Sequence, residues 1–314
     1  MSEKRSYALW LDWPMECFRL SDAQAARFAA MAPRGAEVAV CRSRAAFLRA
    51  LPSATHALVW EFDWRWFARA PRLRLLATPS AGREWMPPPS KVPPGVSVRH
   101  GAFHGAIMAE TAAAFILAHA RGLYRCAEMQ RAGDPWPRTP LSPFCRTVAG
   151  TSAVVLGYGS VGRAVGALLR KLGVRVAGVR RRNVRSLPRL LENADWLIAA
   201  LPSDTGTDDM IGPELLSRLP PRAVLVNVGR GNCIDEPALV DALRRGNLAA
   251  AYLDVVKNEP LSPSSPLHPA NIDGLRTAGG RRLADVLHLL PHASAFSPAY
   301  LDAFLGELRA AGCL

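Results

Sequence analysis

Three glycines with the spacing G-x-G-x-x-G occupy positions 157, 159 and 162 of the 314-residue chain. They follow the apolar stretch 152–156 and precede a helical pattern over 161–172. In such a turn the first glycine permits a tight bend, the second lets a pyrophosphate approach the backbone, and the third lets helix and strand pack closely. The helix start adds free N–H groups and a positive dipole end. A dinucleotide site is therefore predicted, with a glycine-rich structural turn as the alternative, at Gly157, Tyr158, Gly159, Ser160, Val161 and Gly162.

A run of arginines lies about 20 residues further on, where the second strand of such a site ends. NAD-preferring sites place Asp or Glu there to accept from the ribose hydroxyls, but this chain has Arg180, Arg181 and Arg182. An acidic side chain would repel a 2′-phosphate, whereas guanidinium groups pair with it in bidentate geometry. The run favours NADP as the cofactor and leaves NAD possible, and a solvated basic loop is the alternative.

Four more segments follow the glycine turn in a specific order. They are 227–231 (NVGRG), 235–239 (DEPAL), 253–255 (LDV) with 259–261 (EPL), and 291–294 (PHAS). Together with the glycine turn, they resemble the D-isomer-specific 2-hydroxyacid dehydrogenase family, and most closely its glyoxylate/hydroxypyruvate reductase-like members. The first half of the chain resembles the family more faintly, through 78–82, 101–105 and 108–110.

The resemblance implies three catalytic residues, and their chemistry suits the roles. Arg230 would grip a 2-oxo acid through its carboxylate and keto oxygens and polarise the carbonyl. His292 would be the general acid, and Glu259 would hydrogen-bond its imidazole and favour the charged form. Glu259 and His292 are 33 positions apart, more than the family spacing, so His288 is a rival proton donor. The residues on both sides of His292 match the family and favour His292.

The resemblance also implies binding residues. Ser80, Ala81 and Gly82 match the loop whose backbone N–H groups hold the substrate carboxylate, a task shared with Arg230. The positions assigned to the cofactor are Leu201, Pro202, Thr207, Val228, Gly229 and, near the nicotinamide amide, Asp254. No metal site is expected, because the six cysteines are scattered and form no C-x-x-C pair.

Alternating strand and helix patterns predict an α/β fold with parallel sheets. In the first half, strands are expected over 7–13, 37–41, 56–62 and 73–78, and helices over 21–32, 45–51 and 63–70. Proline-rich stretches between residues 86 and 95 indicate a loop, and one long helix is expected over 108–131. In the second half, strands are expected over 152–156, 175–179, 196–201, 223–228, 249–255 and 286–290, and helices over 161–172, 186–193, 213–218, 236–245 and 298–311. Residues 271–285 look like an insertion.

The predicted architecture is two Rossmann-like or flavodoxin-like domains, with the cofactor domain inserted into the substrate domain. Residues 1–107 plus 293–314 are assigned to the substrate (catalytic) domain, and 108–292 to the NAD(P)-binding Rossmann domain. Arg230 falls just past the end of the strand expected over 223–228, which is where α/β sheets place their ligands.

The chain is strongly basic, with 39 Lys and Arg against 26 Asp and Glu and a net charge of +13. Nucleic-acid-binding proteins gather such charge on one face or in a tail, whereas here the basic residues are dispersed. No apolar stretch has the length of a membrane span. We therefore expect no nucleic-acid and no membrane partner, and scattered thiols indicate a cytoplasmic protein. The expected partners are a small 2-oxo acid and, from the family, a second copy in a homodimer.

The predicted function is hydride transfer between NADP(H) and a small 2-oxo acid or D-2-hydroxy acid, of the glyoxylate or hydroxypyruvate kind. The alternative is a regulatory protein on the same scaffold that senses the dinucleotide with little turnover. Retention of the arginine, glutamate and histidine together argues against the alternative, because a sensor needs none of them.

Overall fold

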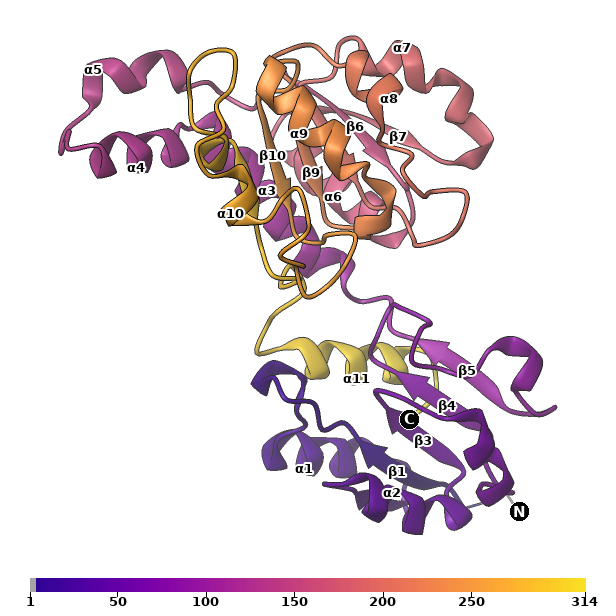
Figure 1. Cartoon of the computed structure of the whole chain (residues 1–314). Coiled ribbons are helices and arrows are strands. Elements are labelled where there is room, and N and C mark those ends of the chain that lie inside the picture. The colour runs from indigo at the N-terminus through magenta and orange to yellow at the C-terminus, as the bar shows by residue number, and fades with distance from the viewer. Residues whose placement is uncertain (1–3) are drawn as a thin grey trace. The chain divides into compact units, whose positions relative to one another are not determined.

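The computed structural model describes residues 4–314, which form two compact units. One unit is the chain up to His104 together with Phe296–Leu314, and the other is Gly105–Ala295. Each unit contains one parallel sheet with helices packed against it (Figure 1). The predicted α/β class with two parallel-sheet domains is confirmed.

The first unit has a five-stranded sheet in the order β2-β1-β3-β4-β5, the flavodoxin-like order. Its strands are β1 (Ser6–Trp10), β2 (Glu37–Val40), β3 (His56–Val59), β4 (Leu75–Thr78) and β5 (Ser97–His100), and its helices are α1 (Asp22–Met31), α2 (Arg44–Ala50) and α11 (Tyr300–Ala310). The sequence patterns did not predict β5, and residues Trp64–Arg69 form a 3-10 helix within the stretch expected to be helical.

A cap at the start of α1 and the two faces of β1 organise the first part of this unit. Ser21 caps α1, because its hydroxyl accepts from the Gln24 backbone N–H at 3.1 Å while the Gln24 side chain accepts from the Ser21 N–H at 3.0 Å. Along β1, alternate side chains face opposite sides of the sheet. Tyr7 therefore packs against Phe28 of α1, and Trp10 stacks on Phe47 of α2.

The second unit has a six-stranded parallel sheet in the order β11-β10-β9-β8-β6-β7. Its strands are β6 (Ser152–Leu156), β7 (Arg175–Val179), β8 (Trp196–Ala199), β9 (Val224–Asn227), β10 (Ala250–Leu253) and β11 (Leu287–Leu289). Its helices are α3 (Gly105–Ala120), α4 (Leu123–Arg131), α5 (Arg138–Leu141), α6 (Ser160–Lys171), α7 (Leu187–Leu191), α8 (Pro213–Ser217), α9 (Glu236–Arg245) and α10 (Pro269–Ile272).

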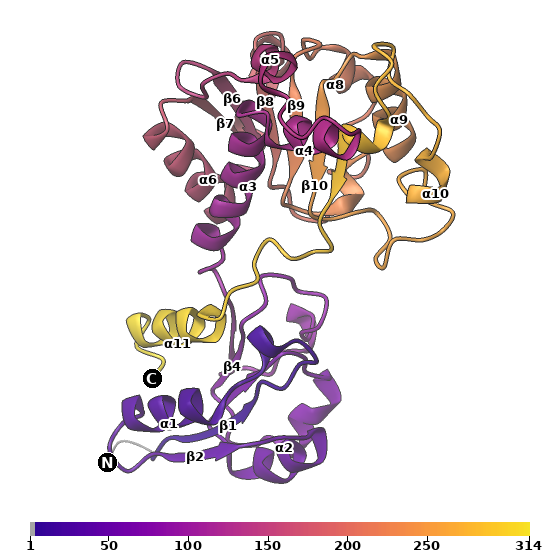
Figure 2. The same cartoon turned by 90° about the vertical axis from the view of Figure 1, so that its left-hand side faces the viewer.

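The strand order of this sheet reverses at β6. The chain passes from β6 to β7 on one side and then returns to β8 on the other side of β6. Because β-α-β crossovers are right-handed, the reversal places α6 on one face and α8 and α9 on the other. Helix α3 packs with α6 (Figure 2). In such a fold the ligand binds outside the carboxyl ends of the strands, at the point of reversal.

The single helix predicted over 108–131 is wrong. The structure has two helices, α3 and α4, with an angle of 59° between them. Gly122 separates them with a left-handed φ of 67°, a conformation that stops an α-helix and that glycine adopts without a Cβ clash. Among residues 4–314 no single helix is long and apolar enough to cross a membrane, and only this bent pair has the combined length and composition. Core packing accounts for the apolar residues of α3.

The extra segment, residues 271–285, runs from the end of α10 toward β11. It begins in the last residues of α10, folds back through an antiparallel bridge between Arg276 and Arg282, and ends in a 3-10 helix at Leu283–Asp285. The segment therefore has a defined local structure of its own, next to α4 rather than in the sheet.

Candidate active site

The glycine turn lies at the point where the strand order reverses. Gly157 has a φ of +85°, and a Cβ there would lie 2.4 Å from the Ala200 carbonyl oxygen. A Cβ on Gly162 would lie 2.3 Å from the Gly157 oxygen, so close packing of α6 on β6 requires glycine. A Cβ on Gly159, by contrast, would meet no described atom within 4 Å. Only this second glycine faces open space, which is the side from which a pyrophosphate would approach the start of α6 at Ser160 and Val161.

Tyr158 links the glycine turn to the arginine run. Its ring covers Gly178 of β7, where a Cβ would lie 2.3 Å from the ring. Its carbonyl oxygen accepts from Arg180 Nε at 2.7 Å. Arg181 is largely exposed and forms an ion pair with Asp204 at 2.8 Å, and Arg182 is exposed. The arginine run thus begins immediately beside the glycine turn.

The loops after β8 and β9 lie side by side. Thr207 is buried and its hydroxyl donates to the Pro202 carbonyl at 2.9 Å, which holds the loop after β8 in shape. Buried Val228 donates its N–H to Ala199 of β8 at 3.0 Å. A Cβ on Gly229 would lie 2.6 Å from the Leu201 nitrogen. The predicted cofactor positions on these two loops are therefore neighbours.

The turn that carries Arg230 is held by Asn227, the fully buried last residue of β9. Asn227 accepts from the Gly229 N–H at 2.9 Å and donates to the Arg230 carbonyl at 3.1 Å, as asparagine does in turns. A Cβ on Gly231 would lie 1.9 Å from the Val256 oxygen. The absence of that Cβ lets the Arg230 turn pack against the loop after β10, which leads to Glu259.

His292 and Glu259 form a hydrogen-bonded pair, with 2.7 Å between Nδ1 and Oε2. The hydrogen bond that Glu259 accepts from the imidazole raises the pKa of His292, because it favours the charged form and outweighs the opposing effect of burial. Burial acts to raise the pKa of Glu259, but the hydrogen bond and charge of His292 outweigh it and the pKa is lowered. The positive charge of Arg230 also acts on both groups. The structure thus brings the three predicted catalytic residues into one electrostatic cluster.

The backbone at His292 has a φ of 50°, which is uncommon for a residue other than glycine. Asp254 holds it there. The Asp254 carbonyl accepts from the His292 N–H at 2.8 Å, and its buried carboxylate accepts from the N–H groups of Ala293 at 2.7 Å and Ser294 at 2.9 Å. The Ser294 hydroxyl donates to the second carboxylate oxygen. Strained backbone of this kind persists only where its surroundings over-determine it.

His288 lies in a different environment from His292. Its ring stacks on Tyr252 at 4.7 Å between centroids and lies 4.4 Å from the ring of Tyr124. Burial lowers its pKa to about 4. Glu259 is paired with His292 and not with this rival histidine.

The predicted substrate loop 80–82 belongs to the other unit, directly after β4. The Ser80 hydroxyl accepts from the Gly82 N–H at 3.1 Å, and Ser80 donates its own N–H to Thr78 at 3.2 Å. Ala81 lies between them, at the exposed top of the turn. The Gly82 carbonyl lies 3.0 Å from His100 Nδ1.

Two positioning residues were missed by sequence reasoning. Asn227 shapes the Arg230 turn, and Ser294 closes the Asp254 hydrogen bonds behind His292. Both belong to segments that resemble the family: Asn227 is the last residue of β9, and Ser294 lies in the loop after β11. A polar side chain at the carboxyl end of a buried strand is the signal that could have identified Asn227, because it must find partners in the following turn.

A doubly wound sheet with a dinucleotide turn and an Arg-Glu-His cluster on neighbouring loops defines the class of dinucleotide-dependent dehydrogenases. Residues 113–274 match the family described as D-isomer specific 2-hydroxyacid dehydrogenase, NAD binding domain. The chain belongs to the D-isomer-specific 2-hydroxyacid dehydrogenase family. The predicted resemblance and the oxidoreductase class are confirmed.

Curated relatives and solved structures agree with this membership. The chain is 33% identical over 220 residues to glyoxylate/hydroxypyruvate reductase B of Pectobacterium carotovorum subsp. carotovorum, which covers 66% of this chain and 69% of the relative. It is 35% identical over 224 residues to glyoxylate reductase of Aeropyrum pernix, covering 66% and 67% of the two chains. The D-isomer specific 2-hydroxyacid dehydrogenase from Xanthobacter autotrophicus Py2, solved with NADPH and MES, superposes with a TM-score of 0.71 at 25% identity, covering 98% and 96%.

Proposed function

We propose that this protein reduces a small 2-oxo acid, of the glyoxylate or hydroxypyruvate kind, to the D-2-hydroxy acid with NADPH. The observation that carries the proposal is the 2.7 Å pair between His292 and Glu259, which shares an electrostatic cluster with Arg230. The names of the relatives that are at least 30% identical support this substrate class.

The residues divide the work as follows. Arg230 binds the substrate carboxylate and polarises the carbonyl, since its planar guanidinium suits two oxygens at once. The nicotinamide, when bound, supplies a hydride to the carbonyl carbon. His292 gives its proton to the carbonyl oxygen, and Glu259 keeps the imidazole charged and correctly turned until then. Asp254 fixes the backbone that presents His292. The loop 80–82 stays a prediction for the substrate carboxylate, and its Ser80 and Gly82 N–H groups already have partners within the turn.

NADP preference rests on the arginine run beside the glycine turn. Arg181 is free to turn toward a 2′-phosphate, because its side chain is 85% exposed and, among the described residues, its ion pair is with the partly exposed Asp204 alone. If a 2′-phosphate replaced Asp204 as the ion-pair partner of Arg181, no additional charge would have to be buried. We expect Arg181→Gln to raise the KM for NADPH roughly tenfold and to leave the KM for NADH nearly unchanged. Arg189→Gln, an exposed arginine of α7, is the matched control. Equal effects on both cofactors would contradict the assignment.

The assay for the activity measures oxidation of NADPH and NADH with glyoxylate, hydroxypyruvate and one bulkier 2-oxo acid. We expect turnover with at least one of the two small acids and a higher kcat/KM with NADPH. NADPH binding without turnover of any of the three acids would contradict the proposal and favour a sensing role.

A homodimer and a cytoplasmic location are part of the proposal. Helices α4 and α5 extend away from the six-stranded sheet of their unit (Figure 1). This projection, residues 123–144, exposes Leu123 of α4, Trp136 of the connection at 81%, and Phe144 after α5. Exposed apolar side chains gathered on one projection are typical of an interface. Sedimentation should show a dimer that Trp136→Ser weakens. Trp85→Ser, at the exposed Trp85 of the other unit, should not weaken it.

The cysteines are free thiols, as in a reducing compartment, and cell fractionation tests the location.

A further inference from the structure

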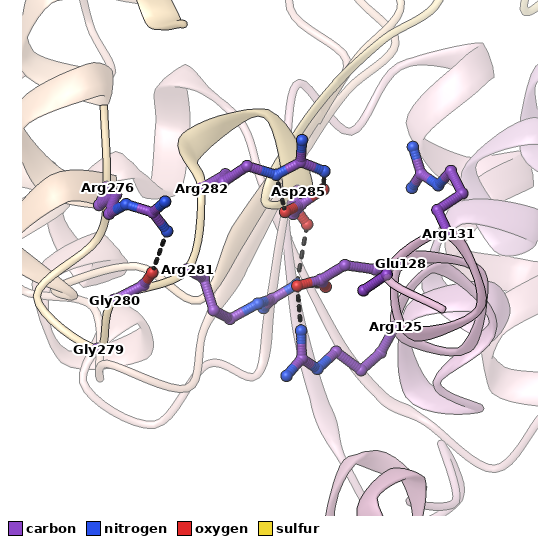
Figure 3. A pocket seen from close by; sticks show the side chains of 10 residues that line it. Arg125, Glu128, Arg131, Arg276, Gly279, Gly280, Arg281, Arg282 and Asp285 are labelled. Atoms are coloured by element: carbon purple, nitrogen blue, oxygen red, sulfur yellow. Dashed lines mark hydrogen bonds and ion pairs between the residues drawn. The ribbon is translucent and has the colours of Figure 1, made fainter. Parts of the chain in front are cut away.

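The extra segment and α4 line an open, charged pocket that the proposed reaction does not use (Figure 3). Its volume is about 550 Å³. Arg125 and Arg131 of α4 and Arg276, Arg281 and Arg282 of the extra segment line it, with only Glu128 and Asp285 to oppose them. Five guanidinium groups against two carboxylates leave an excess of three positive charges in one pocket.

Three of the arginines build the walls. Glu128 accepts from Arg125 and, at 3.0 Å, from Arg281, so it ties α4 to the extra segment. Arg282 forms two hydrogen bonds of 2.9 Å to the buried carboxylate of Asp285. These ion pairs use both carboxylates and give the pocket a fixed shape.

The other two arginines are not neutralised. Arg131 donates to the Ala127 carbonyl at 3.1 Å and Arg276 to the Gly280 carbonyl at 2.9 Å. Neither forms an ion pair with a carboxylate anywhere in the described chain, residues 4–314. In Figure 3 they lie on opposite sides of the ion pairs at the centre of the pocket.

Two more donors point to a missing acceptor. The Nε atoms of Arg125 and Arg281 are buried and have no hydrogen-bond partner among the described residues. A buried donor without a partner is unfavourable, and such groups are rare in folded proteins unless a water or ligand completes them. The pocket therefore offers donors and positive charge in excess of its acceptors.

The pocket is separate from the dinucleotide turn. The extra segment leads into the start of β11, whereas the glycine turn and Arg230 follow the ends of β6 and β9. All neighbouring strands of this sheet are parallel, so their starts and their ends lie at opposite edges. An anion in this pocket would not compete directly with cofactor pyrophosphate.

We propose that the pocket between α4 and the extra segment binds a small anion with at least two phosphate or carboxylate groups. Guanidinium groups recognise both kinds of group through paired N–H donors. One charged group of the ligand contacts Arg131 and the other contacts Arg276, and this arrangement gives the extra segment a role.

The test is calorimetric titration of the NADPH-saturated enzyme with inorganic pyrophosphate and, separately, with citrate. Saturation with NADPH keeps the probes from the glycine turn. The double variant Arg131→Gln/Arg276→Gln removes the two unneutralised charges and leaves the wall-forming ion pairs in place. We expect it to weaken binding of the preferred probe by tenfold or more, since a hydrogen bond to a charged group typically accounts for about that factor. Which probe binds more tightly distinguishes a phosphate from a carboxylate ligand.

Two further variants make the result decisive. Arg34→Gln/Arg309→Gln removes two exposed arginines of the other unit, and Arg230→Gln removes the proposed substrate-binding charge. Both should bind the probe as the wild type does. Loss of binding in Arg230→Gln alone, or equal affinity in all variants, would overturn the proposal. So would the absence of binding to the wild type. A pocket variant that changes the sedimentation coefficient but not the affinity would assign the arginines to self-association and overturn it too.

Discussion

His288 and His292 are four residues apart and lie in opposite surroundings. His292 follows the end of β11, its side chain is half exposed, and its hydrogen bond with Glu259 raises its pKa. His288 lies within β11 between Tyr124 and Tyr252, and burial lowers its pKa to about 4. Near neutral pH the first can hold a proton for transfer and the second cannot. The comparison teaches that the environment, not the residue type, decides which histidine suits the proposed proton transfer.

The two histidines are also held by different means. His288 follows from strand register, because β11 pairs with β10 so that His288 lies opposite Tyr252 and stacks on it. His292 stands in a left-handed turn that Asp254 holds with its carbonyl and its carboxylate. The position of His288 is set by the pairing of β11 with β10. The position of His292 is set by hydrogen bonds that Asp254 makes to the loop after β11.

The largest expected effect comes from replacing each of the two histidines separately and comparing the activities of the two variants. His292→Gln should lower kcat for 2-oxo acid reduction by roughly 10²–10⁴, the usual contribution of a general acid. His288→Phe keeps the aromatic stack and should leave kcat within about threefold of the wild type, because it removes no proposed catalytic group. Steady-state kinetics with NADPH measures both. The reverse pattern would assign the proton to His288.

Asp254→Asn tests the loop that presents His292. Its carboxylate accepts from two backbone N–H groups and one hydroxyl, and an amide replaces one acceptor with a donor. We expect unfolding free energy to fall by about 2–3 kcal/mol, since hydrogen bonds to charged groups are the strong ones. We also expect kcat to fall more than KM changes. Urea unfolding and steady-state kinetics are the measurements.

Ser294→Ala is the milder companion of that variant. It removes one donor and leaves the Asp254 carboxylate and both backbone bonds in place. We expect the free energy of unfolding to fall by about 1 kcal/mol. An Asp254→Asn enzyme that is as stable and as active as the wild type would refute the positioning role.

The buried histidine should make the fold sensitive to acid. His288 has a pKa of about 4 in the folded chain, below the 6.5 of a free histidine. Between those values the unfolded chain binds a proton that the folded chain does not, so stability falls as pH falls through this window. Protonation of His288 in the unfolded chain should lower the free energy of unfolding by about 2 kcal/mol between pH 7 and pH 5.

His288→Phe should remove that part of the acid sensitivity and leave the part that is due to His119 and to His56, whose pKa burial also lowers to about 4. His119 lies 3.0 Å from the Tyr252 hydroxyl, and burial lowers its pKa to about 4 as well. Urea unfolding at pH 7, 6 and 5 gives the slope for each protein. An unchanged slope in the variant would show that His288 titrates normally in the fold.

Glu259→Gln should lower kcat at neutral pH by about tenfold, less than His292→Gln does. Glu259 raises the pKa of His292, and the reduction needs the protonated imidazole. The rate should therefore fall as pH rises through that pKa, and the variant should lose activity at a lower pH than the wild type. The oxidation, which needs neutral imidazole, should keep its activity to lower pH. Rate profiles in both directions measure the shift, and an unmoved alkaline limb would contradict it.

Local patterns were enough to predict much of the second unit. The bounds of β6, β7 and α9 agree with the expectation, and so do the glycines of the dinucleotide turn. Apolar runs, cap residues and glycines act over a few neighbouring positions, so they can be read without the rest of the chain. The assigned roles of the site residues stay predictions until the variants above are measured.

The sequence by itself determined the family, the α/β class and the turn at Gly157. Only the tertiary structure decided that His292 rather than His288 meets Glu259, because 33 residues and an extra segment separate the partners along the chain. It also placed the extra segment's arginines opposite those of α4, a pairing that no local pattern contains. Strand register, burial and contacts between distant segments set these outcomes, and each depends on how the whole chain packs.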